Sequence, residues 1–150
     1  MATVPIHLVL AEDDDGHATL IQRNLERVGL VNGFTRLKDG QAALDFLFGE
    51  GAYAGRTVSD TTLLLLDIKM PRVDGVEVLR RIKADARTAR MPVIMLTTTD
   101  DPREIERCYQ LGCNVYVTKP IDSQAFIEAI KRLGLFLQVV QVPRNGNGPG

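Results

Sequence analysis

Short apolar runs alternate along this chain with segments whose apolar residues recur every three or four positions. The first run, Ile6–Ala11, has the length and composition of a buried strand. Ala18, Ile21 and Leu25 follow it at helical spacing, and the same unit recurs four more times. The later apolar runs span residues 33–37, 62–66, 93–96 and 114–118, and the helical segments after them span residues 41–48, 73–84, 100–112 and 122–140. This alternation predicts a parallel sheet in which a helix lies on each strand-to-strand connection.

The expected architecture is a single α/β domain with a doubly wound, five-stranded parallel sheet. The chain has 150 residues, the usual size of one domain, and no internal repeat or boundary divides it. We expect this domain to span residues 1–142. Residues 143–150 consist mostly of Pro, Gly and Asn and offer nothing that a core could bury, so we expect a disordered tail there.

The charge and the cysteine content exclude several classes of function. Lys and Arg number 18 against 19 Asp and Glu, so the formal net charge of -1 gives no electrostatic reason to expect nucleic-acid or membrane-surface binding. The longest apolar run, Leu63–Leu66, is too short to cross a bilayer, and the first residues lack the pattern of a signal peptide. Cys108 and Cys113 have no further Cys or His pair with which to form a zinc site. We therefore expect a cytoplasmic protein with two reduced, buried cysteines.

Polar side chains follow four of the five expected strands at the point where each strand ends. Ligands bind beside the carboxyl ends of strands in open parallel sheets, so we expect these side chains to meet at one rim. They are Glu12, Asp13 and Asp14 after the first strand, Asp67 after the third, Thr97 and Thr98 after the fourth, and Lys119 after the fifth.

The carboxylates at this rim indicate a bound cation. Like charges held close together raise one another's pKa unless a cation joins them, and oxygen ligands without His or Cys favour a hard ion such as Mg²⁺. Asp14 and Asp15 have a simpler role, because either can cap the following helix. Capping does not explain Asp67, which follows an apolar run and precedes no immediate helix. Lys119 follows a strand that ends at the same rim, and a lysine beside a carboxylate site for a metal indicates a counter-charge for phosphoryl oxygens. The Thr97 hydroxyl can also donate to these oxygens.

Taken together, these segments resemble the receiver domains of two-component signalling, the CheY-like response regulators. The resemblance covers roughly residues 6–140 in the family's order and spacing. The segments that carry it are Leu10-Ala11-Glu12-Asp13-Asp14, Leu65-Leu66-Asp67-Ile68-Lys69-Met70-Pro71, Asp74-Gly75, Leu96-Thr97-Thr98 and Tyr116-Val117-Thr118-Lys119-Pro120. It implies a flavodoxin-like fold with strand order 2-1-3-4-5, and a phosphoacceptor instead of a turnover enzyme.

The resemblance also implies a role for each rim residue. Asp67 would accept a phosphoryl group from the phosphohistidine of a histidine kinase. Asp13, Asp67 and the backbone carbonyl of Lys69 would bind Mg²⁺ directly, and Glu12 would contribute to this metal site through a water molecule. The groups in contact with the phosphoryl oxygens would be Lys119, Thr97 and Thr98. Thr97 and Tyr116 would form a switch that remodels the surface of the fourth helix, fifth strand and fifth helix.

Within the family, the chain is most similar to the small single-domain regulators paired with bacterial and cyanobacterial phytochromes. The residues behind this narrower resemblance are 49–54, 82–85, 96–98 and 136–140. It implies a phytochrome histidine kinase as the partner. The last helix carries, besides its core stripe, a second apolar group at Leu135, Phe136, Val139 and Val142. Unless that helix is buried on two sides within one molecule, we expect a homodimer through the fourth helix, fifth strand and fifth helix.

Two alternatives come from other functional classes. A haloacid-dehalogenase-like phosphatase also uses Asp, Mg²⁺, Thr and Lys, and Asp13-x-Asp15-Gly16 resembles its first motif, but that class gives Asp67 no role. A receiver-fold scaffold that works without phosphorylation would typically lose the acidic pair, the central Asp or the Lys, all of which this chain retains.

One departure from the family pattern is Lys69, two residues after Asp67, where a small polar residue is common. A lysine side chain at this place could lie over the phosphoryl group and impede an attacking water, or it could simply be solvated. We therefore hypothesise slow autodephosphorylation.

Overall fold

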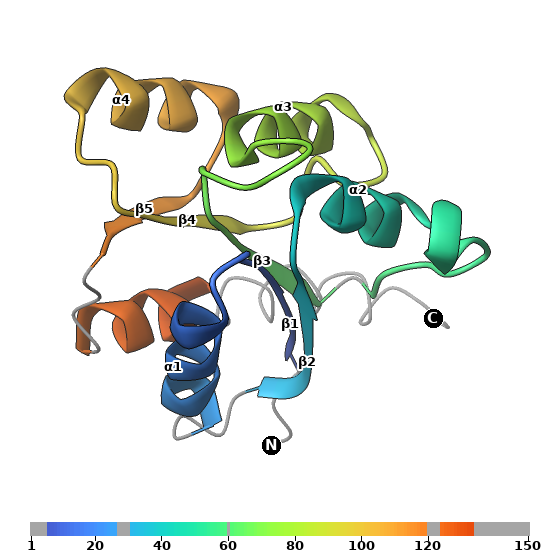
Figure 1. Ribbon diagram of the computed structural model, residues 1–150, viewed down its shortest axis with the longest axis horizontal. Coiled ribbons are helices and arrows are strands. Elements are labelled where there is room, and N and C mark those ends of the chain that lie inside the picture. Colours follow the sequence, from blue (N-terminus) through green and yellow to red (C-terminus); the bar gives the residue numbers. More distant parts are fainter. Residues whose placement is uncertain (1–5, 27–30, 60, 120–123, 134–150) are drawn as a thin grey trace, which may run out of the picture.

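The computed structural model describes residues 6–26, 31–59, 61–119 and 124–133, with the side chains of residues 31 and 32 left aside. Figure 1 shows a central sheet with helices on both of its faces. The strands are β1 (Ile6–Ala11), β2 (Val31–Leu37), β3 (Thr62–Leu66), β4 (Val93–Thr97) and β5 (Val115–Thr118). The helices are α1 (Asp15–Glu26), α2 (Gly40–Phe48), the short 3-10 helix η1 (Gly51–Tyr53), α3 (Gly75–Ala84), α4 (Pro102–Leu111) and a final helical segment at residues 124–133.

The sheet has the strand order β2-β1-β3-β4-β5, and all four pairings are parallel, so the predicted α/β topology is confirmed. Leu10 of β1 lies opposite Arg36 of β2 on one side and Leu65 of β3 on the other. The strand order reverses between β1 and β3. In open parallel sheets the crevice beside such a reversal is where ligands bind.

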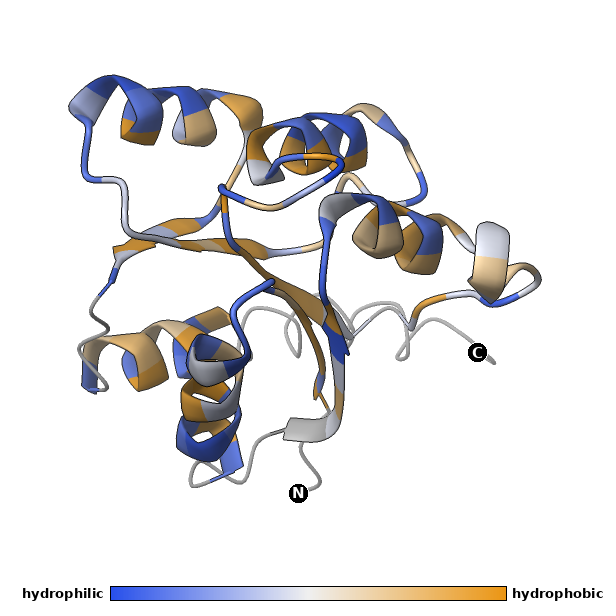
Figure 2. Ribbon diagram, in the orientation of Figure 1, coloured by the Kyte–Doolittle hydropathy of each residue, from blue (hydrophilic) through white to orange (hydrophobic). Residues whose placement is uncertain are grey.

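Two hydrophobic cores lie on opposite faces of the sheet, because successive side chains of a strand point to opposite faces. Val9, Leu64 and Met95 pack under α2, α3 and α4, whereas Leu8 and Leu65 pack against α1 and residues 124–133. The four leucines of β3 are fully buried, which is why the sequence shows a continuous apolar run there. Figure 2 shows the apolar sides of the helices turned toward the sheet.

Aspartates begin the helices on the rim side of the sheet. Asp39 caps α2 by accepting from the Ala42 N–H at 2.7 Å, and Asp101 caps α4 by accepting from the Arg103 N–H at 2.9 Å. Asp14 accepts from the His17 N–H at 2.8 Å at the start of α1, which confirms the capping role predicted for it. The third helix begins at Gly75 and not at residue 73, because the cap is Asp74, whose side chain accepts from the Glu77 N–H.

Both cysteines are free and buried, as the sequence analysis expected, and burial raises the pKa of Cys108 to about 11 and that of Cys113 to about 12. Among the described residues, the structure has no helix long and apolar enough to span a bilayer. Several expectations lie outside the described residues: the start of the last helix at residue 122 and its end near residue 140, the domain boundary at 142, the tail at 143–150 and the second apolar group after residue 134.

Candidate functional site

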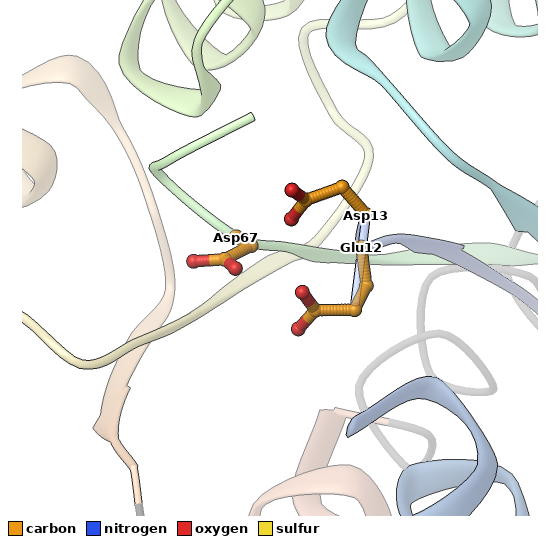
Figure 3. Close-up of side chains that lie close together, drawn as sticks. All are labelled: Glu12, Asp13 and Asp67. Atoms are coloured by element: carbon orange, nitrogen blue, oxygen red, sulfur yellow. The ribbon is translucent and has the colours of Figure 1, made fainter. Parts of the chain in front are cut away.

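Three carboxylates from two strand ends meet at the rim of the sheet. Glu12 and Asp13 directly follow β1, and Asp67 directly follows β3. One oxygen of each of the three side chains lies within 4.8 Å of the others, and Figure 3 shows the three groups around one space. The Asp67 N–H donates to the Ala11 carbonyl at 3.0 Å, so the backbone hydrogen bonds of the sheet continue into the site and keep the two strand ends together.

The cluster is closed on one side and open on the other. Glu12 is 1% exposed and Asp67 is 8% exposed, whereas Asp13 is exposed to solvent. Burial raises the pKa of Glu12 above its ordinary value of 4.5, and the nearby Asp67 adds to this effect. The hydrogen bond from Lys119 acts in the opposite direction and favours the ionised form of Glu12.

Lys119 supplies the positive charge at this cluster. Its ammonium nitrogen donates to Glu12 Oε1 and, at 3.3 Å, to Asp67 Oδ2, and the side chain is only 6% exposed. The Lys119 N–H donates to the Thr97 carbonyl at 2.8 Å, which places the lysine beyond the ends of β4 and β5. A single ammonium group among three carboxylates leaves an excess of negative charge, which fits a divalent cation bound by oxygen ligands.

A tight loop connects Asp67 to α3. The Ile68 N–H donates to Asp67 Oδ1 at 2.7 Å, and the Gly75 N–H donates to the Ile68 carbonyl at the same distance. A Cβ atom at position 75 would lie 2.0 Å from the Asp67 carbonyl oxygen. Only glycine allows this approach of two backbone segments. Lys69 lies in this loop, two residues after Asp67, and is exposed.

The residues expected to contact the phosphoryl group or to form the switch lie at the end of β4 and in β5: Thr97, Thr98 and Tyr116. Thr97 is the last residue of β4 and is fully buried, whereas Thr98 is exposed. Thr97 Oγ1 accepts from the Thr99 N–H at 3.3 Å, and the Tyr116 hydroxyl donates to the Thr99 carbonyl at 2.7 Å. The backbone of Thr99 therefore connects the two residues that the sequence analysis expected to form a switch.

Comparison with known proteins agrees with this geometry. The family model described as the response regulator receiver domain matches residues 8–131. The chain belongs to this family. A receiver domain is a phosphoacceptor and not a turnover enzyme, and its acidic site corresponds to Glu12, Asp13 and Asp67.

Two proteins illustrate which receivers this one is similar to. It is 39% identical over 135 residues to the probable methanogenesis regulatory protein FilR2 of Methanothrix harundinacea, covering 87% of this chain and 84% of FilR2. It is 31% identical over 140 residues to the response regulator Rcp1 of Synechocystis, covering 93% and 94% of the two chains.

Two solved structures of such regulators superpose well on this receiver. The Mn(2+)-bound form of Rcp1 gives a TM-score of 0.75 with 30% identity over 89% of this chain and 95% of that one. The phosphorylated cyanobacterial phytochrome response regulator RcpA gives a TM-score of 0.75 with 32% identity over 89% and 94% of the two chains.

Two residues of this receiver site were not found by sequence reasoning. His17 Nδ1 lies 3.1 Å from the Lys119 ammonium nitrogen, and the guanidinium of Arg36 donates to the Glu12 carbonyl at 2.9 Å. Nothing in the sequence indicated a role for His17, because it is a single polar residue in the first turn of α1, where its side chain is exposed. Arg36 could have been noticed as a charged residue within the expected strand at 33–37, but the sequence does not show which atoms its side chain would contact.

Proposed function

We propose that this receiver accepts a phosphoryl group on Asp67 from the phosphohistidine of a histidine kinase. An Asp67 carboxylate oxygen attacks the phosphorus atom, the phosphorus–nitrogen bond breaks, and its electron pair returns to the kinase imidazole. The observation that carries this proposal is the position of Asp67, at the end of β3 and 3.3 Å from the Lys119 ammonium nitrogen. In such transfers, positioning and charge neutralisation supply most of the catalysis.

Glu12, Asp13 and Asp67 would hold Mg²⁺ together with the backbone carbonyl of Lys69. Bound there, the cation would neutralise negative charge on the phosphoryl oxygens. The three carboxylates within 4.8 Å support this assignment, as does the Mn(2+)-bound form of the similar regulator Rcp1. Asp13 is the most accessible of the three, so it leaves a path by which a hydrated ion can enter.

The phosphoryl oxygens would be contacted by three side chains of this chain. Lys119 would move its hydrogen bond from Asp67 Oδ2 to a phosphoryl oxygen while it remains bonded to Glu12. Thr97 would exchange its contact with the Thr99 N–H for one with the phosphoryl group, and Thr98 would contact the same group. For Thr97 the exchange replaces a neutral hydrogen bond with one to a charged acceptor, and such charge-assisted bonds are stronger.

The same exchange would transmit the signal to a neighbouring surface. If Thr97 turns toward the phosphoryl group, the Thr99 backbone loses one of its two side-chain partners, and Tyr116 is free to turn inward. The affected surface consists of α4, β5 and residues 124–133, which lie along one end of the sheet in Figure 1. We assign this surface to a homodimer contact, supported by the position of β5 at the edge of the sheet.

The kinase would be a phytochrome that the receiver meets in the cytoplasm. The similarity to the phytochrome response regulator RcpA supports this partner. Phosphotransfer from a purified phytochrome kinase, compared with a kinase of another class at equal concentration, tests it directly. Equal transfer rates from the two kinases would contradict the phytochrome assignment and leave the phosphoacceptor function intact.

Intact mass spectrometry after incubation with acetyl phosphate tests the phosphoacceptor function. We expect the mass of one added phosphoryl group in the presence of Mg²⁺, and no gain either with EDTA or in Asp67→Asn. Asp14→Asn is the matched control, because it removes a neighbouring carboxylate that caps α1 and should leave the gain intact. No gain in folded wild-type protein would overturn the proposal in favour of a scaffold that works without phosphorylation.

A further inference from the structure

Arg36 is the last but one residue of β2, and its guanidinium reaches over the end of β1. Its Nε–H donates to the Glu12 carbonyl at 2.9 Å, and Nη1 donates to Asp15 Oδ1 at 2.6 Å. The next residue of the strand, Leu37, accepts from the Glu12 N–H at 3.0 Å. Two consecutive residues of β2 therefore hold both polar groups of the Glu12 main chain.

These two hydrogen bonds to the Glu12 main chain act directly on the acidic site. The Glu12 carbonyl belongs to the planar peptide group that joins Glu12 to Asp13, so its hydrogen bond fixes the plane from which the Asp13 backbone continues. Asp13 is exposed and lacks the packing that holds Asp67 in place. The orientation of its carboxylate therefore depends on the backbone of the loop between β1 and α1, which Arg36 ties at Glu12 and again at Asp15.

Stability alone explains the placement of Arg36 poorly. Its side chain is only 20% exposed, and among the described residues its Nη2 is a buried polar atom without a hydrogen-bond partner, a condition that costs free energy. The ion pair with Asp15 gains little, because the Asp15 side chain is 79% exposed. The guanidinium charge also opposes the binding of a cation to the neighbouring carboxylates.

We propose that Arg36 is a positioning residue for the divalent cation: by holding the Glu12 main chain, it orients the Glu12 and Asp13 carboxylates toward their common ligand. This inference rests on the proposed function of the acidic site. The positioning effect and the charge effect of Arg36 have opposite signs. Loss of the charge strengthens cation binding, whereas loss of the hydrogen bonds weakens it, so the direction of the change separates the two.

Isothermal titration with Mg²⁺ tests the proposal on the wild-type chain, Arg36→Met, Arg36→Lys and the control Lys38→Met. We expect Arg36→Met to bind Mg²⁺ about tenfold more weakly, the usual size of the effect when a partner of a metal ligand is lost. Arg36→Lys should also bind Mg²⁺ more weakly. Lysine keeps the positive charge, but it lacks the guanidinium geometry that donates to Glu12 and to Asp15 at the same time. Lys38→Met removes an exposed positive charge from the same strand end and should bind Mg²⁺ as tightly as the wild type or slightly more tightly.

Thermal melts of the same four proteins, recorded without metal, separate positioning from folding. Unchanged or tighter Mg²⁺ binding in folded Arg36→Met would overturn the inference, even if its melting temperature fell. If Arg36→Met does not fold, Arg36→Lys provides the test. Weaker Mg²⁺ binding by Arg36→Lys supports the positioning role, and Mg²⁺ binding as tight as that of the wild type overturns it. Failure of the wild-type chain to bind Mg²⁺ would instead overturn the proposed function on which the inference rests.

Discussion

The carbonyl oxygen of Asp67 lies 2.0 Å from the place that a Cβ atom on Gly75 would occupy. The two residues are held there by the hydrogen bond from the Gly75 N–H to the Ile68 carbonyl, at 2.7 Å. The first turn of α3 thus packs directly on the backbone of the proposed phosphoacceptor. This contact gives the Asp74-Gly75 pair a physical role: Asp74 caps the helix, and Gly75 lets the capped turn approach Asp67.

Gly75→Ala should therefore be strongly destabilising. The added methyl group meets backbone atoms that cannot move away without displacing Asp67, so we expect a loss of about 2–3 kcal/mol in the free energy of unfolding. Urea denaturation measures this loss. Gly16→Ala in α1 is the matched control, because its nearest contact is a side-chain oxygen at 3.3 Å and not a backbone atom, so alanine there should cost much less stability than at position 75. Equal midpoints for the two variants would contradict the contact.

Glu12→Gln should change the pH dependence of stability in the metal-free protein. The pKa of Glu12 is raised in the folded state, so the contribution of this one group to stability is fully present while Glu12 is protonated and is lost as pH rises through that pKa. Glu12→Gln lacks this loss. Its unfolding free energy relative to wild type should thus increase as pH rises from about 4.5, the ordinary value of a glutamate, toward neutrality.

Urea denaturation in EDTA at several pH values measures the Glu12→Gln effect, and Asp14→Asn provides a control of opposite sign. The hydrogen bond from the His17 N–H lowers the pKa of Asp14, so wild-type stability from this group is present above its ordinary pKa and is lost as pH falls. Asp14→Asn should therefore lose stability relative to wild type as pH rises. The same pH trend in both variants would be inconsistent with a raised pKa at Glu12.

Both cysteines should resist alkylation in the folded protein. Cys108 is fully buried with a pKa of about 11, and Cys113 is 6% exposed with a pKa of about 12. At pH 8 the reactive thiolate is then about one in a thousand of the Cys108 population, and less for Cys113. Mass spectrometry after iodoacetamide treatment should find two labels in urea and essentially none in buffer. Rapid native labelling of either cysteine would contradict its burial.

Tyr109→Phe should loosen the edge strand β5. The Tyr109 hydroxyl accepts from the Tyr116 N–H at 3.0 Å, so a side chain of α4 satisfies a backbone group that no further strand can pair. We expect faster hydrogen exchange at the Tyr116 amide and a loss of about 0.5–1 kcal/mol. Tyr53→Phe, at a ring that packs edge-on against Phe46, should leave that exchange rate unchanged. An unaltered rate in Tyr109→Phe would show that the hydroxyl does not protect the strand.

Lys69→Asn should shorten the lifetime of the phosphorylated form severalfold. The lysine is exposed in the loop that follows Asp67, where its side chain can cover the phosphoryl group. Dephosphorylation after removal of acetyl phosphate, followed by intact mass, measures the lifetime. Arg72→Asn is a control in the same loop, because asparagine tolerates the left-handed backbone at that position, where φ is 69°. An unchanged lifetime in Lys69→Asn would refute slow autodephosphorylation caused by this side chain.

Much of the fold and of the acidic site followed from local pattern in the sequence. The leucine run predicted β3 and the aspartates after the first strand predicted the cap of α1, since continuous burial and capping depend on neighbouring residues. Glu12, Asp13, Asp67 and Lys119 were found because each follows a strand, and parallel strands end at one edge. Residue 73 was wrongly included in α3, because apolar periodicity does not distinguish a helix from its capping loop.

The sequence by itself therefore determined which side chains gather at the rim and the cation chemistry they favour. Only the tertiary structure decided how those side chains are held. The Arg36–Glu12 bond joins residues 24 apart, and the His17–Lys119 contact joins residues 102 apart. Such contacts depend on the register of β2 against β1 and on the rotamers that packing selects. Strand ends follow from short-range periodicity, whereas the directions of the guanidinium and the imidazole follow from the assembled sheet.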